Sequence, residues 1–130
     1  MSKLTAVFLI LVGLINFIPV LGIFSQQNIE NAYSIKLASD DLIILMKHRA
    51  LLFGVIGGFV LYSVFVPSYQ TAAMVLVGIS MIGFVFLVLQ VGEYNQSIFK
   101  ILIADLVGIV FLLLAVISRY INRTSLLPNG

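Results

Sequence analysis

The sequence contains no cysteine, a single histidine and few charged side chains. Without cysteine the chain cannot form a disulfide, a thiolate nucleophile, an iron–sulfur cluster or a zinc site with cysteine ligands. A single histidine excludes a site built from several imidazole groups of one chain, and we predict no metal. Charged residues make up only 9% of the chain, against about 25% in soluble domains, which excludes a water-soluble enzyme. The 7 basic and 5 acidic residues form no basic run, so we expect no nucleic-acid partner.

Hydrophobic side chains make up 62% of the chain and gather in long runs. A bilayer core about 30 Å thick is crossed by a helix of about 20 apolar residues. Runs close to that length lie at residues 4–24, 42–66, 72–92 and 101–118. Because the later connections are short, neighbouring helices are expected to be antiparallel. We therefore predict an all-α fold, an integral membrane up-down four-helix bundle, in a single domain of residues 1–130 with both termini on one side.

The connections between these runs carry the turn and capping residues. Residues 25–41 are expected to form the only sizeable loop, in which Ser39, Asp40 or Asp41 caps the next helix. Residues 93–100 are expected to link the third and fourth helices. The first apolar run is longer than the cleaved segment of a signal peptide, about 7–15 residues, so we expect it to be retained.

Basic residues near the ends of the runs predict the orientation in the membrane. Lys3, Arg119 and Arg123 lie on the terminus side, and they favour cytoplasmic termini in the inner (plasma) membrane of a bacterium. The number of basic residues on the opposite side depends on whether Lys47 and Arg49 are included. If both are counted as flanking charges of the opposite side, the prediction reverses.

Small residues predict where the helices approach each other closely, because membrane helices associate through small side chains and polar contacts. They recur at helical spacing in the last three runs. The predicted packing residues are Ala50, Gly54, Gly57, Gly58, Gly83, Ala104 and Gly108. Asp105 shares the side of the small residues on the fourth helix, so we expect it to face protein rather than lipid. Because transmembrane helices are generally rich in glycine, the glycines by themselves indicate packing and no particular function.

Polar side chains gather in one half of the predicted bilayer. Counting 1.5 Å per residue from the terminus side places Arg49 roughly 5 Å, Asp105 roughly 9 Å and Asn16 roughly 12 Å inside the opposite boundary. Each predicted helix contributes at least one polar group to this half, which predicts a one-sided intramembrane pocket. The predicted ligand-binding residues are Asn16, His48, Arg49, Gln90, Glu93 and Asp105.

A structural role is the main alternative for the charged members of this set. An unpaired aspartate in hydrocarbon costs a few kcal/mol, so Asp105 is expected to be paired, hydrated or protonated. Arg49 is the best candidate partner because its guanidinium group matches a carboxylate, and Glu93 and Lys100 are competitors. Such a pair would clamp two helices together without binding a ligand.

The residues beside Arg49 allow simpler explanations as well. Lys47 and Arg49 can extend to the lipid head groups, and His48 on its own is more typical of an interfacial side chain than of a ligand. A metal held by His48, Glu93 and Asp105 would lack a second imidazole, so we do not expect one.

Short glycine-rich motifs give the chain a resemblance to a known family. Residues 42–58 read LIILMKHRALLFGVIGG, and they follow a first helix that ends Asn16-Phe-Ile-Pro19 and a loop with a tyrosine. Over most of residues 4–118 the chain resembles the DoxX-like group of small four-helix bacterial membrane proteins, in particular an uncharacterised subgroup. The resemblance implies four helices in the inner membrane and no established catalytic residues. The quinone-coupled thiol oxidation proposed for the group would require a partner, since this chain has no thiol.

Three function classes follow from these features. The first is a binding protein whose pocket holds the polar head of a lipid, a quinone or another amphiphile. The second is an accessory or scaffold subunit that docks another membrane protein or a further copy of the chain. The third is an enzyme acting on a lipid or quinone, although no catalytic constellation is recognisable. Transport by a dimer is a more distant alternative. We predict no bound cofactor, with a quinone as the one candidate.

Overall fold

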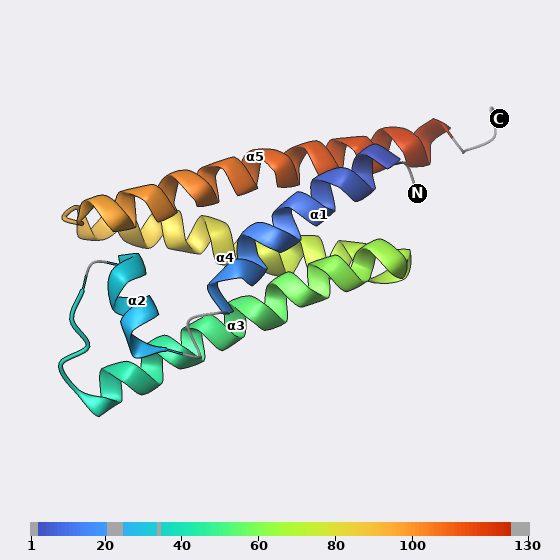
Figure 1. Ribbon diagram of the computed structural model, residues 1–130. Coiled ribbons are helices and arrows are strands. Elements are labelled where there is room, and N and C mark those ends of the chain that lie inside the picture. The colour runs from blue at the N-terminus through green and yellow to red at the C-terminus, as the bar shows by residue number, and fades with distance from the viewer. Residues whose placement is uncertain (1–2, 21–24, 34, 126–130) are drawn as a thin grey trace.

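The computed structural model describes residues 3–20, 25–33 and 35–125, with side chains for all of these except 26, 32 and 122–125. Within these ranges every regular element is a helix, which confirms the predicted all-α class. The helices are α1 (Lys3–Phe17), α2 (Gln26–Tyr33), α3 (Asp40–Phe65), the 3-10 turn η2 (Pro67–Tyr69), α4 (Gln70–Val91) and α5 (Gln96–Ser125) (Figure 1).

Four segments of the described chain are long and apolar enough to cross a membrane. They are Lys3–Val20, Asp40–Phe65, Pro67–Val91 and Gln96–Ile121. Large apolar side chains remain exposed along all four, as on a multi-pass membrane protein. Phe65, Val91 and Ile79, for example, are 82%, 72% and 67% exposed. Soluble monomers rarely expose so many large apolar side chains, so this outer surface is compatible with an apolar environment such as a membrane.

The first helix ends earlier than the predicted span 4–24. Helix α1 stops at Phe17 and is followed by a 3-10 turn over residues 18–20, while residues 21–24 lie outside the described ranges. Pro19 accounts for the change, because proline has no N–H to donate and disfavours helical geometry in the residue before it. The first helix is consequently the shortest of the four long ones.

Local capping sets the ends of the other helices. Ser39 caps α3 as predicted, its Oγ accepting a hydrogen bond from Leu42 N at 3.2 Å. Gly92 ends α4 with φ of +81°, a left-handed conformation that glycine adopts without strain. Asn95 Oδ1 then accepts a hydrogen bond from Ile98 N at 2.8 Å at the start of α5. The predicted connection 93–100 is therefore too long, since α5 begins at Gln96.

Helix α2 lies in the segment 25–41, which the sequence predicted to be a loop throughout. Ser25 Oγ accepts a hydrogen bond from Asn28 N at 3.3 Å at its start. Ile29 is only 3% exposed, and it holds the helix against its neighbours α3 and α5. Because α2 is short and mostly polar, it lacks the long apolar pattern by which the other helices are recognised.

The four long helices form a bundle in which α1 and α4 each pack between α3 and α5 (Figure 1). Three hydrogen bonds between side chains and neighbouring segments bring four helix ends together. They are Thr5–Ser118 at 2.8 Å, Arg119 Nη1 to Thr71 Oγ1 at 2.7 Å and Gln70 Nε2 to Ser63 O at 3.1 Å. We call this end of the bundle, where α1 begins and α5 ends, the terminus end, and the opposite end the loop end.

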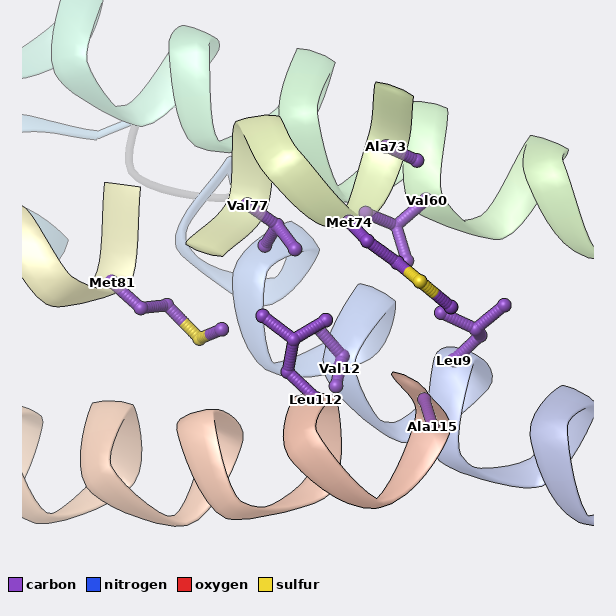
Figure 2. Packing of buried hydrophobic residues seen from close by; sticks show 9 residues of the cluster. All are labelled: Leu9, Val12, Val60, Ala73, Met74, Val77, Met81, Leu112 and Ala115. Carbon is purple, nitrogen blue, oxygen red and sulfur yellow. The ribbon is translucent and has the colours of Figure 1, made fainter. Parts of the chain in front are cut away.

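The hydrophobic core fills the part of the bundle nearer the terminus end. Figure 2 shows its buried side chains, which come from all four long helices. They are Leu9, Val12, Val60, Ala73, Met74, Val77, Met81, Leu112 and Ala115. The ring of Phe8 stacks on that of Phe111 at 6.1 Å beside this core. This packing keeps the helices close together at the terminus end.

Glycines set the close approach of α1 to α3. A Cβ added at Gly57 would lie 2.5 Å from Phe17 N and 2.7 Å from Gly13 O, so no larger residue fits without moving the α1 backbone. Gly54 meets the side chain of Val20 in the same way.

The other predicted packing residues differ in their surroundings. A Cβ at Gly108 would lie 2.7 Å from Met81 Sδ, and one at Gly58 only in ordinary contact with Phe17. Ala50 is buried, whereas Ala104 is exposed. At Gly83 a Cβ would meet nothing within 4 Å, so this glycine is not needed for close packing within one chain.

Candidate functional site

A cavity of about 590 Å³ lies in the loop-end half of the bundle, lined by residues of α1, α2, α3 and α5. Its position follows from the length of α1, because 15 helical residues cover about 22 Å, whereas the 30 of α5 cover about 45 Å. Beyond the end of α1 the long helices α3 and α5 diverge, and α2 lies between them (Figure 1).

The walls of the cavity are mostly apolar, with a small set of polar groups. The apolar lining consists of Ile15, Ile18, Pro19, Ile29, Met46, Ala50, Phe53, Ile101 and Ala104. The polar lining consists of Asn16, Asn28, Asn31, Tyr33, Arg49 and Asp105. An apolar wall with a few convergent polar groups is typical of a small-molecule site.

Asp105 is the buried acidic group of this cavity. Its side chain is 7% exposed and projects from α5 into the lining. Within the described part of the chain it makes no hydrogen bond and no ion pair. A carboxyl group removed from water without a donor is costly, so the cavity must supply Asp105 with a proton, a water molecule or a ligand group.

Arg49 on α3 is held by aromatic rings. Its guanidinium carbon lies 5.2 Å from the ring centre of Tyr33 on α2, 4.9 Å from Phe53 on α3 and 5.3 Å from Phe84 on α4. Such cation–π contacts stabilise the charge and restrict its position. Among the described residues its N–H groups donate no hydrogen bond, so they remain available to an acceptor.

Arg49 and Asp105 thus line the same cavity, but they do not pair directly. No ion pair joins them in the described ranges, and the aromatic rings take the place of the carboxylate that the sequence suggested as partner. Because apolar walls weaken screening, we expect the charge of Arg49 to act on the Asp105 carboxyl across the cavity. Energetic coupling between the two residues stays a prediction.

Asn16 lies where the hydrophobic core meets the cavity. Its side chain is 2% exposed, and Nδ2 donates to Val12 O at 2.9 Å and to Met81 Sδ at 3.6 Å. These contacts fix the amide to α1 and α4. Within the described ranges no hydrogen bond uses its Oδ1, which leaves an acceptor beside the cavity.

Helix α2 forms a wall of the cavity, in a segment for which the sequence predicted only a loop. Asn95 Nδ2 at the start of α5 donates to Tyr33 O at 2.7 Å, and Glu30 Oε1 accepts from Leu37 N at 2.9 Å. These bonds hold the C-terminal part of α2 over the cavity. The spacing of Ile29 and Tyr33, four residues apart and therefore on one helix face, is the signal in the sequence that favours this helix.

The remaining predicted site residues lie elsewhere. His48, Gln90 and Glu93 are exposed and do not line the cavity. Helix α4 contacts Arg49 through Phe84 but contributes no residue to the cavity lining. Its Gln90 therefore does not share the cavity with Asp105. Among the described residues no three His, Cys, Asp or Glu side chains gather as a metal site would require.

A second hollow, of about 360 Å³, lies between α3 and α4 and is almost entirely apolar. Arg49 and Phe53 line this groove as well as the cavity. Gly83, whose α-carbon faces open space, forms part of its wall.

The chain matches no family model, no curated protein and no solved structure. The resemblance to the DoxX-like group therefore stays a prediction, and the function must be argued from the cavity itself.

Proposed function

We propose that this protein is a multi-pass membrane protein that binds the polar head of an amphiphile in the cavity between α1, α2, α3 and α5. The observation that carries the proposal is the buried Asp105 carboxyl, which faces the cavity without a hydrogen-bond or ion-pair partner among the described residues. A structural ion pair would satisfy this group within the protein. A binding site leaves it to the ligand.

The size and lining of the cavity support a ligand with a polar head and an apolar tail. Its volume of about 590 Å³ lies within the range of about 300–1,000 Å³ found for small-molecule sites. Exposed residues of two kinds take part in the lining: Asn28 and Asn31 on α2, and Ile18 and Ala104 beside the apolar outer surface. The head group lies among the polar residues while the tail leaves along the apolar ones.

The four long helices cross the bilayer as an up-down bundle, with the terminus end at the cytoplasmic face of a bacterial inner membrane. Their length and apolar outer surface support the insertion. Lys3 and Arg119 at the terminus end support the orientation, while the side chain of Arg123 lies outside the described residues. Glu93 and Asp41 at the loop end agree with it, although acidic residues contribute little to orientation.

Native mass spectrometry of the full chain, released from detergent micelles, tests the proposal. We expect a stoichiometric lipid, quinone or other amphiphile on the wild-type protein, and reduced retention in Asp105→Asn and Arg49→Gln. Asp41→Asn and Arg119→Gln make the same chemical changes at exposed or surface positions away from the cavity, so they should retain the ligand. Equal retention in all five proteins, or no retained amphiphile in any, would contradict the proposal.

A further inference from the structure

An arginine and an aspartate line the cavity, and among the described residues neither forms an ion pair. We propose that its ligand carries a zwitterionic head group, with an anionic phosphate or carboxylate on Arg49 and an ammonium group on Asp105. The inference rests on the proposed function and names the chemical class of the ligand.

The contacts of Arg49 explain why the two charges stay apart. Rings from α2, α3 and α4 hold the guanidinium group on the α3 side, whereas Asp105 belongs to α5. Contacts with aromatic rings use none of the hydrogen bonds that the guanidinium N–H groups can donate, and no described residue accepts one, so these donors are left for an acceptor in the cavity. Phosphate and carboxylate match this fork of donors.

The residues that α5 and α1 contribute to the cavity lining offer acceptors. Asp105 supplies carboxyl oxygens without a donor among the described residues, and Asn16 supplies Oδ1. An ammonium group carries three N–H donors and no acceptor, so it suits a lining that offers acceptors. The hydrogen bonds of Asn16 Nδ2 to Val12 O and Met81 Sδ hold the amide in place for this contact.

Other head groups satisfy only one side of the cavity. The oxygens of a quinone accept hydrogen bonds from Arg49 but offer no donor to an ionised Asp105. A purely anionic head group pairs with Arg49 and places a second negative charge near Asp105, where the apolar walls weaken screening. A zwitterion neutralises both groups, and its net charge of zero lowers the cost of entering the cavity.

Two sources can supply such a head group, a membrane lipid such as phosphatidylethanolamine or a water-soluble zwitterion such as phosphoethanolamine. The full chain in detergent is titrated with phosphatidylethanolamine, its N-acetylated form, phosphatidylglycerol and phosphoethanolamine, and binding is measured by native mass spectrometry. We expect phosphatidylethanolamine to bind at least about tenfold more tightly than phosphatidylglycerol or the N-acetylated lipid, which keeps the phosphate and lacks the ammonium. Phosphoethanolamine binding as tightly as the lipid would support the zwitterion and assign it to a soluble ligand.

The variant Asp105→Asn should abolish the preference for phosphatidylethanolamine, and Asp41→Asn should keep it. The N-acetylated lipid tests the same contact on the wild-type protein, so the inference does not depend on the folding of a variant. If the protein retains a quinone or prefers phosphatidylglycerol, the zwitterion is refuted and the proposed amphiphile binding stands. If no amphiphile binds, both are refuted.

Discussion

Arg49 on α3 and Asp105 on α5 face one cavity, and neither makes an ion pair with the other among the described residues. Three aromatic rings hold Arg49, and the Asp105 carboxyl is buried beside the apolar wall. A helix clamp would require direct pairing of the two residues, so their separation agrees with the proposed binding site. It also sets the size of the effects expected on mutation.

A double-mutant cycle with Arg49→Gln and Asp105→Asn should show moderate coupling. The two residues line one mostly apolar cavity, where screening is weak, and no ion pair joins them among the described residues. We expect a coupling energy of about 1–2 kcal/mol, below the 3–5 kcal/mol typically lost when one partner of a direct buried pair is removed. Unfolding of the ligand-free protein in detergent measures it. Strictly additive effects would show that the two charges act independently.

The substitution Arg49→Lys should destabilise the fold although it keeps the charge. Lysine lacks the broad guanidinium group that contacts the rings of Tyr33, Phe53 and Phe84, so we expect a loss of about 1–2 kcal/mol in the free energy of unfolding. Arg119→Lys is the control, because its hydrogen bond to Thr71 lies near the surface. Equal stabilities of the two variants would rule out a special role for the aromatic contacts.

Gly57→Ala and Gly83→Ala should have opposite effects. The added Cβ at Gly57 meets backbone atoms of Phe17 and Gly13, so α1 must shift, at a cost of about 1–3 kcal/mol. At Gly83 it meets nothing within 4 Å, and the higher helix propensity of alanine should raise stability by up to about 1 kcal/mol. Chemical unfolding in detergent compares the two. A destabilised Gly83→Ala would instead indicate a neighbour outside this chain.

Two substitutions of Asn95 should separate its two roles. Asn95→Asp keeps the oxygen that accepts from Ile98 N and replaces the Nδ2 donor to Tyr33 O, whereas Asn95→Ala loses both. We expect faster hydrogen exchange in α2 for both variants, and destabilisation of α5 by about 1 kcal/mol for Asn95→Ala only. Unchanged exchange in residues 26–33 would mean that this bond does not hold α2.

Single cysteines report the topology, since the natural chain contains none. Ser68→Cys lies in the turn η2 at the terminus end, and Glu93→Cys lies between α4 and α5 at the loop end; both positions are exposed. A membrane-impermeant maleimide should label Ser68→Cys from the cytoplasmic side and Glu93→Cys from the other. Labelling of both from one side would be incompatible with an odd number of crossings between them.

Much of the fold follows from local chemistry that a single sequence displays. The long apolar runs predict four helices, and the helix cap at Ser39 is readable because serine accepts a hydrogen bond from the backbone three residues later. The candidate site could be predicted only in part from the sequence. Counting depth along each helix brought Asn16, Arg49 and Asp105 into one half of the bundle, where all three line the cavity, but it also included His48, Gln90 and Glu93.

The sequence alone thus determined the helical class and the depth at which polar groups lie along each helix. Both follow from the length of the apolar runs and the rise of about 1.5 Å per helical residue. The tertiary structure decided which helix faces meet. It placed α2 between α3 and α5, turned Arg49 toward three rings, and left Asp105 without a hydrogen bond or ion pair among the described residues. These outcomes depend on the early end of α1 at Phe17 and on contacts between residues far apart in the chain, which no local pattern specifies.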